Sequence, residues 1–269
     1  MKTPSILYLA INLETSVERR KSVLNQGRKL GLDIHLVRAV SGKELKQDDL
    51  EGYDRRRRHK EFVSDLTLNE HACIYSHCKA LRLFLESDDD FCVVFEDDVL
   101  IRDFFSEGIQ YLVTETSGWE CCKLYTDHSK LYSLPPYSKS APFRLVFPKK
   151  LPWVAVANLY TRKGARYILE GFQRYWLGFD VQWAQILLSR QVPVCGVSPG
   201  LAVSADPDNT NSDIDRGMPR CSLLEGKRRS LFQYGFYRLS VWSMAFGKFF
   251  MRLKLCKMYS NIGKNIFPK

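Results

Sequence analysis

The chain has 269 residues, of which 45% are hydrophobic and 26% are charged, and it carries a formal net charge of +10 with a pI near 9.2. This composition excludes a disordered chain, and the length allows one large α/β domain or a domain with an appendage. The positive charge favours a polyanionic partner and does not choose between nucleic acid, an anionic membrane surface and a phosphorylated substrate.

The cysteines and the N-terminus indicate a reduced protein without a secretion signal. The eight cysteines lie mostly among apolar residues, Cys121 and Cys122 are adjacent, and no CxxC pair or Cys/His set has the spacing of a structural zinc site. The apolar run at 6–11 is too short for the core of a signal peptide, and no stretch is long and apolar enough to span a membrane. We therefore expect buried thiols, a cytoplasmic protein and a first buried strand at 6–11.

Strand-like and helix-like segments alternate in the first part of the chain. Apolar runs at 6–11, 34–40 and 91–95 alternate with helical patterns at about 16–30 and 67–87, and further helices near 163–174 and 180–190 precede a strand-like VPVCGVSP. The helix at 67–87 starts with a capping box, Thr67 and Glu70, and has one apolar stripe. This alternation predicts an α/β fold with a mostly parallel sheet flanked by helices.

Two segments differ from this pattern. The Pro- and Ser-rich stretch 133–152 predicts a long surface excursion around a short apolar run. In the final residues, aromatic and aliphatic side chains recur at helical spacing from Phe232 to Leu253 with basic residues beside them. This C-terminal amphipathic helical extension either lies in a membrane interface or packs on the protein's own core. We divide the chain into a domain at 1–225 and a membrane-associating segment at 226–269.

The stretch FCVVFEDDVLI runs from a buried strand directly into three carboxylates, Glu96, Asp97 and Asp98. In open α/β sheets, ligands bind beyond the carboxyl ends of strands. If the backbone stays extended, Glu96 and Asp98 share one face and offer two hard oxygen ligands to Mg²⁺ or Mn²⁺. The alternative is an acidic turn that faces water, as we expect for the SDDD stretch at 87–90.

An ordered set of blocks resembles glycosyltransferase family 25, the lipooligosaccharide and collagen galactosyltransferase group. The blocks are INLETSVERRKSV (11–23), LTLNEHACIYSHCKAL (66–81), VVFEDDVLI, LYTRKGARYIL (159–169), the pair Phe179–Asp180 and SDI (212–214), and together they cover about residues 5–215. The chain departs from the family pattern at Asn69, His71 and Ala72, and it has no histidine after His128 to serve as a late metal ligand.

The resemblance implies a GT-A fold, a UDP-sugar donor, a divalent metal, Mn²⁺ or Mg²⁺, and inversion at the anomeric carbon. It implies that Glu96 and Asp98 are the outer acids of the metal-binding motif. Because the chain lacks a late histidine, we expect the coordination to be completed by Asp213, with Asp206, Asp208 or water as alternatives. The resemblance also implies a bacterial enzyme on the inner face of the cytoplasmic membrane. Such an enzyme would add galactose, in preference to glucose, to a lipooligosaccharide or lipopolysaccharide core or a related lipid-linked glycan.

Roles follow for several residues, each with a structural alternative. Asp180 is the candidate base that takes the proton of the acceptor hydroxyl, or it caps the following helix.

The donor-binding candidates are Asn12 and Arg20 beyond the first strand, with Glu96 and Asp97, and Trp153 for stacking on a sugar ring. Arg20 and Trp153 could equally be a solvated helix residue and a core residue. His77 is interpreted as a core or helix-face histidine. The run DRRRRHK at 54–60 is a solvated charge run or a docking site for lipid phosphates.

Two other functions remain open. A metal-dependent phosphodiesterase or nuclease would also combine an acidic cluster with a basic surface, although histidines are sparse here. A catalytically inert protein of the same fold that binds glycans is the third possibility.

Overall fold

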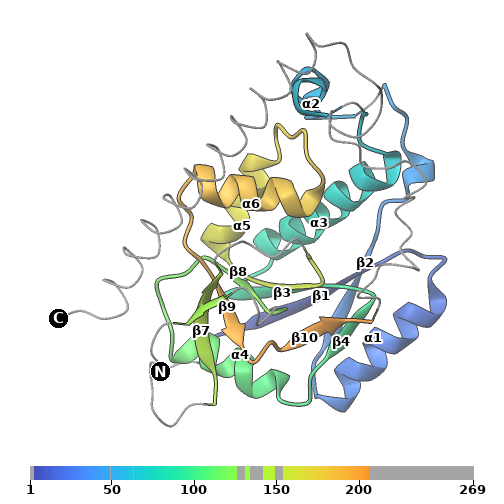
Figure 1. Cartoon of the computed structure of the whole chain (residues 1–269). Coiled ribbons are helices and arrows are strands. Elements are labelled where there is room, and N and C mark those ends of the chain that lie inside the picture. The colour runs from blue at the N-terminus through green and yellow to red at the C-terminus, as the bar shows by residue number, and fades with distance from the viewer. Residues whose placement is uncertain are drawn as a thin grey trace.

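The computed structural model describes residues 3–48, 50–62, 64–125, 131–133, 142–148 and 154–205. The described part forms a sheet with helices on both faces (Figure 1). Four predicted site or ligand candidates and one predicted segment lie outside the described residues: Trp153, Asp206, Asp208, Asp213 and the segment 226–269.

The main sheet has eight strands in the order β2-β1-β3-β8-β5-β9-β7-β6. Their bounds are β1 Ile6–Asn12, β2 Ile34–Arg38, β3 Phe91–Glu96, β5 Cys121–Lys123, β6 Leu131–Ser133, β7 Arg144–Pro148, β8 Ala157–Thr161 and β9 Val194–Ser198. Only β8 and β7 run against the other six strands, because each pairs antiparallel with both of its neighbours. The predicted α/β class with a mostly parallel sheet is therefore confirmed.

Helices cover both faces of this sheet, and the described residues include α1 Val17–Lys29, α2 Arg55–Glu61, α3 Leu68–Glu86, α4 Phe105–Thr114, α5 Arg162–Gly171 and α6 Phe179–Ser189. In Figure 1, α3, α5 and α6 lie on one face, and α1 and α4 lie on the other. The alternation of side chains along β3 follows from this arrangement: Phe95 packs on Phe105 of α4, whereas Glu96 points toward α3. No helix in the described part is both long enough and apolar enough to cross a bilayer.

Helix α3 is fixed at both of its ends. At its start, the predicted capping box forms: the Glu70 amide donates to the Thr67 hydroxyl at 3.2 Å, and the Glu70 carboxylate accepts from the Thr67 amide at 2.9 Å. At its end, the Arg162 guanidinium from α5 donates to the carbonyls of Phe84, Leu85, Ser87 and Asp89. Carbonyls at the end of a helix otherwise lack partners. Arg162, which belongs to the family-like block at 159–169, therefore fixes the end of this helix.

The acidic stretch does not stay extended as one strand. β3 ends at Glu96, and residues 97 and 98 form a turn into the short strand β4 (Val99–Ile101). β4 pairs antiparallel with β10 (Ala202–Ser204), and the Ala205 amide donates to the Asp98 carbonyl at 2.8 Å. The conditional prediction that Glu96 and Asp98 share a strand face is therefore wrong, because pairing with a distant segment turns the backbone.

Two surface predictions also change. The apolar run inside the Pro-rich stretch forms β7, which pairs with β9 and buries Leu145 and Val146, so that part is a sheet strand.

The basic run at 54–60 forms α2 and is only partly solvated. Arg58 is buried and donates to the Ser64 carbonyl at 2.8 Å, while the Arg57 guanidinium lies 3.3 Å from the centre of the Trp176 ring. These two arginines hold α2 on the domain.

Candidate active site

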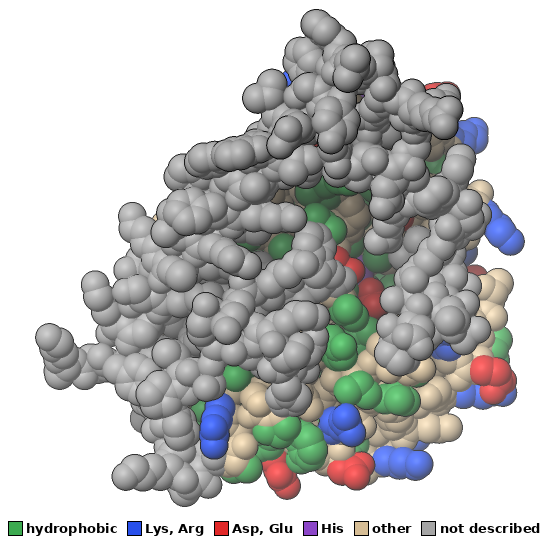
Figure 2. Space-filling view, viewed as in Figure 1, with side chains coloured by type: hydrophobic (Ala, Val, Ile, Leu, Met, Phe, Trp, Pro, Cys, Tyr) green, Lys and Arg blue, Asp and Glu red, His purple; other side chains and the backbone are tan. Residues whose placement is uncertain are grey.

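The three carboxylates at the end of β3 lie at the edge of the sheet where the parallel strands end. Glu96 pairs in register with Ile11 of β1, so the ends of β1 and β3 are adjacent. This is the edge at which open α/β sheets bind ligands. In the view of Figure 2, acidic side chains and a histidine are visible near the middle of the molecular face. The three carboxylates have three different environments.

Asp97 is held by the end of β1 and by α1. The Asn12 side-chain amide donates to the Asp97 carboxylate at 2.6 Å and to the Ser16 carbonyl at 3.1 Å. Arg19 forms an ion pair with Asp97 at 3.5 Å, whereas the predicted donor ligand Arg20 lies half-buried at the next position of α1. Asn12, predicted to bind the donor, is itself buried and fixes the orientation of Asp97.

Asp98 is the carboxylate whose charge is least compensated. Its Oδ2 accepts from the Ser204 hydroxyl at 3.0 Å, while its Oδ1 is buried with no hydrogen-bond partner among the described residues. Burial, followed by the charge of Glu96, raises the pKa of Asp98 to about 6. A bound cation would satisfy this oxygen and offset the repulsion, so Glu96 and Asp98 fit the divalent metal that the sequence implies.

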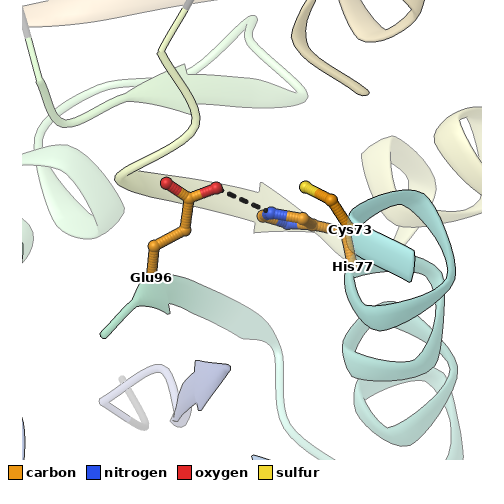
Figure 3. Close-up of side chains that lie close together, drawn as sticks. All are labelled: Cys73, His77 and Glu96. Carbon is orange, nitrogen blue, oxygen red and sulfur yellow. Dashed lines mark hydrogen bonds and ion pairs between the residues drawn. The ribbon is translucent and has the colours of Figure 1, made fainter. Parts of the chain in front are cut away.

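Glu96 is oriented by a histidine from α3. His77 Nε2 lies 3.1 Å from Glu96 Oε1, and only 3% of the His77 side chain is exposed (Figure 3). The imidazole also stacks on the Phe179 ring, with centroids 3.8 Å apart and planes at 14°. The histidine is buried, as the structural alternative predicted, and it links Glu96 to the start of α6.

Asp180 lies in the first turn of α6, and it does not cap this helix. The helix begins at Phe179 with Gly178 as its N-cap, so the predicted capping role of Asp180 is wrong. The charge of Asp180 acts together with that of Glu96 on both Cys73 and Lys123. The structure thus brings the candidate base and a candidate metal ligand into one charged cluster, although 84 positions separate them.

The cation in this cluster is Lys123 at the carboxyl end of β5. Its side chain is buried, its Nζ donates to the Val154 carbonyl at 2.8 Å, and it lies 4.3 Å from the centre of the Trp183 ring. Burial lowers the pKa of Lys123, and the carboxylates of Asp180 and Glu96 oppose this effect. Because desolvation of an unpaired ammonium is costly, these carboxylates are the reason that a lysine is tolerated here.

Sequence reasoning missed three residues of this region: Arg19, Cys73 and Lys123. The signal for Lys123 was present, because a charged residue at the carboxyl end of a short apolar strand stands where ligands bind. Arg19 could not be distinguished from Arg20 by its spacing. Cys73 looked like one of several buried thiols, and its closeness to Glu96 is visible only in the fold.

Comparison with protein families identifies the chain. The model of glycosyltransferase family 25, described as an LPS biosynthesis protein family, matches residues 6–151, which is more than half of the chain. The chain belongs to glycosyltransferase family 25. The matched region contains Asn12, the acidic triplet, His77 and Lys123, so most of the charged cluster of this family 25 chain lies inside it.

Three insect proteins, each named "Glycosyltransferase 25 family member", match parts of the chain. The Aedes aegypti protein is 28% identical over 131 residues, covering 43% of this chain and 20% of the relative. The Anopheles gambiae protein is 30% identical over 125 residues, covering 43% and 21%. The Drosophila pseudoobscura pseudoobscura protein is 25% identical over 171 residues, covering 60% and 24%. The matching part thus spans only a fifth to a quarter of each relative.

Solved structures also match the chain. One of them is the D211N mutant of a Drosophila β1,4-galactosyltransferase 7 in complex with manganese, UDP-Gal and xylobiose. The TM-score is 0.38 at 11% sequence identity, and the match covers 86% of this chain and 79% of the other.

Proposed function

We propose that this family 25 chain is an inverting glycosyltransferase that moves a hexose from a UDP-sugar to a glycan with the help of Mn²⁺ or Mg²⁺. The observation that carries the proposal is the acidic triplet at the carboxyl ends of β1 and β3, within the region that matches the family. Three carboxylates at the ligand-binding edge of the sheet would repel a bare diphosphate. An acidic triplet there fits a cation-bridged diphosphate better than a bare one.

The carboxylates divide the work of holding the donor. Glu96 and Asp98 present oxygen atoms to the cation, and Asp97, fixed by Asn12 and Arg19, orients the turn between them. When bound, the metal would neutralise charge on the diphosphate leaving group. The hydrogen-bond contact with His77 limits the motion of Glu96, so less side-chain freedom is lost when the donor binds.

Asp180 is the proposed base that accepts the proton of the attacking acceptor hydroxyl. Its position in the charged cluster places it near the candidate metal ligands without making it one of them. The ammonium of Lys123 favours the ionised carboxylate of Asp180, and a proton acceptor must be ionised. Lys123 thereby acts as a positioning residue for the base.

The donor sugar, the acceptor and the location are finer parts of the proposal. We propose galactose before glucose as the transferred hexose, and a lipooligosaccharide or lipopolysaccharide core, or a related lipid-linked glycan, as the acceptor. The description of the family as LPS biosynthesis proteins and the net charge of +10 support an acceptor at an anionic membrane surface. The chain would then be a peripheral protein on the cytoplasmic side of the membrane, with the segment 226–269 at the lipid interface.

The first test is the thermal stability of the full chain with Mn²⁺ and a panel of UDP-sugars, compared with UDP alone and with UDP without metal. A ligand at 100 times its Kd stabilises the folded state by about 2.7 kcal/mol, which corresponds to a rise in Tm of about 5–10 °C for a domain of this size. We expect a metal-dependent rise that is largest for one UDP-hexose.

Two variants sharpen this test. Asp98→Asn should abolish the metal-dependent shift, whereas Asp90→Asn should retain it, because Asp90 lies at the opposite end of β3 and accepts from Ser5. If no UDP-sugar shifts the Tm of the wild-type protein at millimolar concentration, the enzymatic proposal fails. If one UDP-sugar does shift the Tm, mass spectrometry of the product formed with a lipid-linked glycan would identify the donor and the acceptor.

A further inference from the structure

Three side chains with different ligand chemistry converge beside the acidic triplet. Cys73 and His77 lie one turn apart on the same face of α3, and Glu96 reaches toward them from the end of β3 (Figure 3). One ligand atom from each, the thiol sulfur, an imidazole nitrogen and a carboxylate oxygen, lies within 4.8 Å of the other two. Among the described residues, this is the set of three such groups that is close enough to hold a metal ion.

The spacing of these atoms is close to that of a metal site. Around zinc, with bonds of about 2.0–2.3 Å to nitrogen, oxygen and sulfur, tetrahedral ligand atoms lie about 3.5 Å apart. The observed upper limit of 4.8 Å therefore requires a contraction of about an ångström, which χ rotations of Cys73 and Glu96 can supply. His77 needs no movement of its ring, because it is held against Phe179.

The surroundings favour a cation at this point. The negative charges of Glu96, Asp180 and Glu70 all act on the position of the Cys73 sulfur. The same carboxylates attract a divalent cation, which would displace the thiol proton to solvent and bind the sulfur as thiolate. The helix that carries two of the three ligands is fixed at both ends, by the capping box and by Arg162. Two ligands are thus preorganised before any metal binds.

We propose that Cys73, His77 and Glu96 form a zinc-binding site that leaves a fourth position open. Thiolate and imidazole select Zn²⁺, whereas carboxylate and water oxygens suit Mn²⁺ and Mg²⁺. The zinc site therefore differs in chemistry from the site proposed for the donor, and the two share Glu96. Sequence spacing indicated no structural zinc site, and this set escapes such a search because its third ligand comes from a strand 19 positions further on.

A consequence, which rests on the proposed function, is that Zn²⁺ and the metal-bound donor compete. Glu96 Oε1 already lies 3.1 Å from His77 on α3, so a zinc ion bound there would leave the Glu96 carboxylate unavailable to the donor cation beside Asp98. We expect Zn²⁺ to weaken UDP-sugar binding. Of the two described carboxylates proposed to hold the donor cation, Asp98 alone would remain available.

The test uses the untagged full chain, freed of metal, with Zn²⁺ binding measured by calorimetry and Co²⁺ binding measured by absorption. We expect one zinc equivalent and a thiolate-to-cobalt charge-transfer band in the near ultraviolet. Cys73→Ser should lower the zinc affinity at least about 100-fold and remove the band, as expected when a ligand is lost. Cys78→Ser is the matched control, because Cys78 is a buried thiol on the same helix outside the set, and it should keep both signals.

Zinc binding by Cys73→Ser with wild-type affinity, or survival of its cobalt band, would overturn the zinc site. Cys73→Ala provides the same comparison if Cys73→Ser does not fold, as judged by circular dichroism. Calorimetry with UDP and Mn²⁺ then separates the two proposals. Zinc binding without any UDP binding would leave this site standing while the transferase proposal fails, and simultaneous binding of zinc and donor at full affinity would refute the sharing of Glu96.

Discussion

Replacing Asp98 by Asn should stabilise the metal-free protein at neutral pH while removing the proposed metal-dependent binding of the donor. The folded-state pKa of Asp98 is about 6, against 3.8 for an unperturbed aspartate. The folded state therefore holds the Asp98 proton more tightly than the unfolded state. The stability that this proton contributes is fully present below about pH 4 and is lost as the pH rises through 6.

The magnitude follows from the size of the shift. A shift of about two units, at about 1.4 kcal/mol per unit, makes the ionised Asp98 cost up to about 3 kcal/mol above pH 6. Asn cannot ionise and should escape this cost, and it can still accept a hydrogen bond from Ser204. The stability difference between Asp98→Asn and wild type should thus grow between pH 4 and 6 and level off above pH 7.

The assay is urea denaturation of both proteins in a chelating buffer at a series of pH values. Asp97→Asn is the control of opposite sign, because Asp97 is already paired with Arg19 and loses that partner, at a cost of roughly 1 kcal/mol. A stability difference for Asp98→Asn that does not change with pH, or a loss of stability at pH 8, would refute the assignment of an uncompensated buried charge to Asp98.

Other predictions concern the cluster, the helix ends and the C-terminal segment. Lys123→Met should destabilise the fold by roughly 3–5 kcal/mol in urea denaturation, because Glu96 and Asp180 lose their buried cation; a neutral result would mean that water or another cation compensates these carboxylates. Arg162→Ala should cost roughly 2–4 kcal/mol by uncapping α3, whereas its exposed neighbour Lys163 should tolerate Ala within about 0.5 kcal/mol. Equal midpoints for these two variants would contradict the capping role. Removing residues 226–269 should reduce sedimentation with anionic liposomes while sparing UDP binding; unchanged sedimentation, or an unfolded remainder, would place this segment on the core.

Sequence reasoning worked best where the signal is local. The capping box at Thr67 and Glu70 lies within one helical turn, so the start of α3 was predictable and is confirmed. The strands β1 and β3 are continuous apolar runs, as expected for strands buried on both faces of a sheet. The position of the acidic triplet at a strand end follows from the same pattern, and the ordered blocks indicated the family that is now shown.

The rest depends on contacts between distant segments. The turn at Asp97 exists because β4 pairs with β10 about 100 positions later, and β7 belongs to the sheet because it pairs with β9. The environments of the three carboxylates likewise come from α1, α3 and residue 204, which no local pattern connects. Sequence by itself determined which residues could bear charge at this edge of the sheet. Only the tertiary structure decided which charges are paired, because burial and neighbouring charges, and not residue type alone, set the energy of an ionised group.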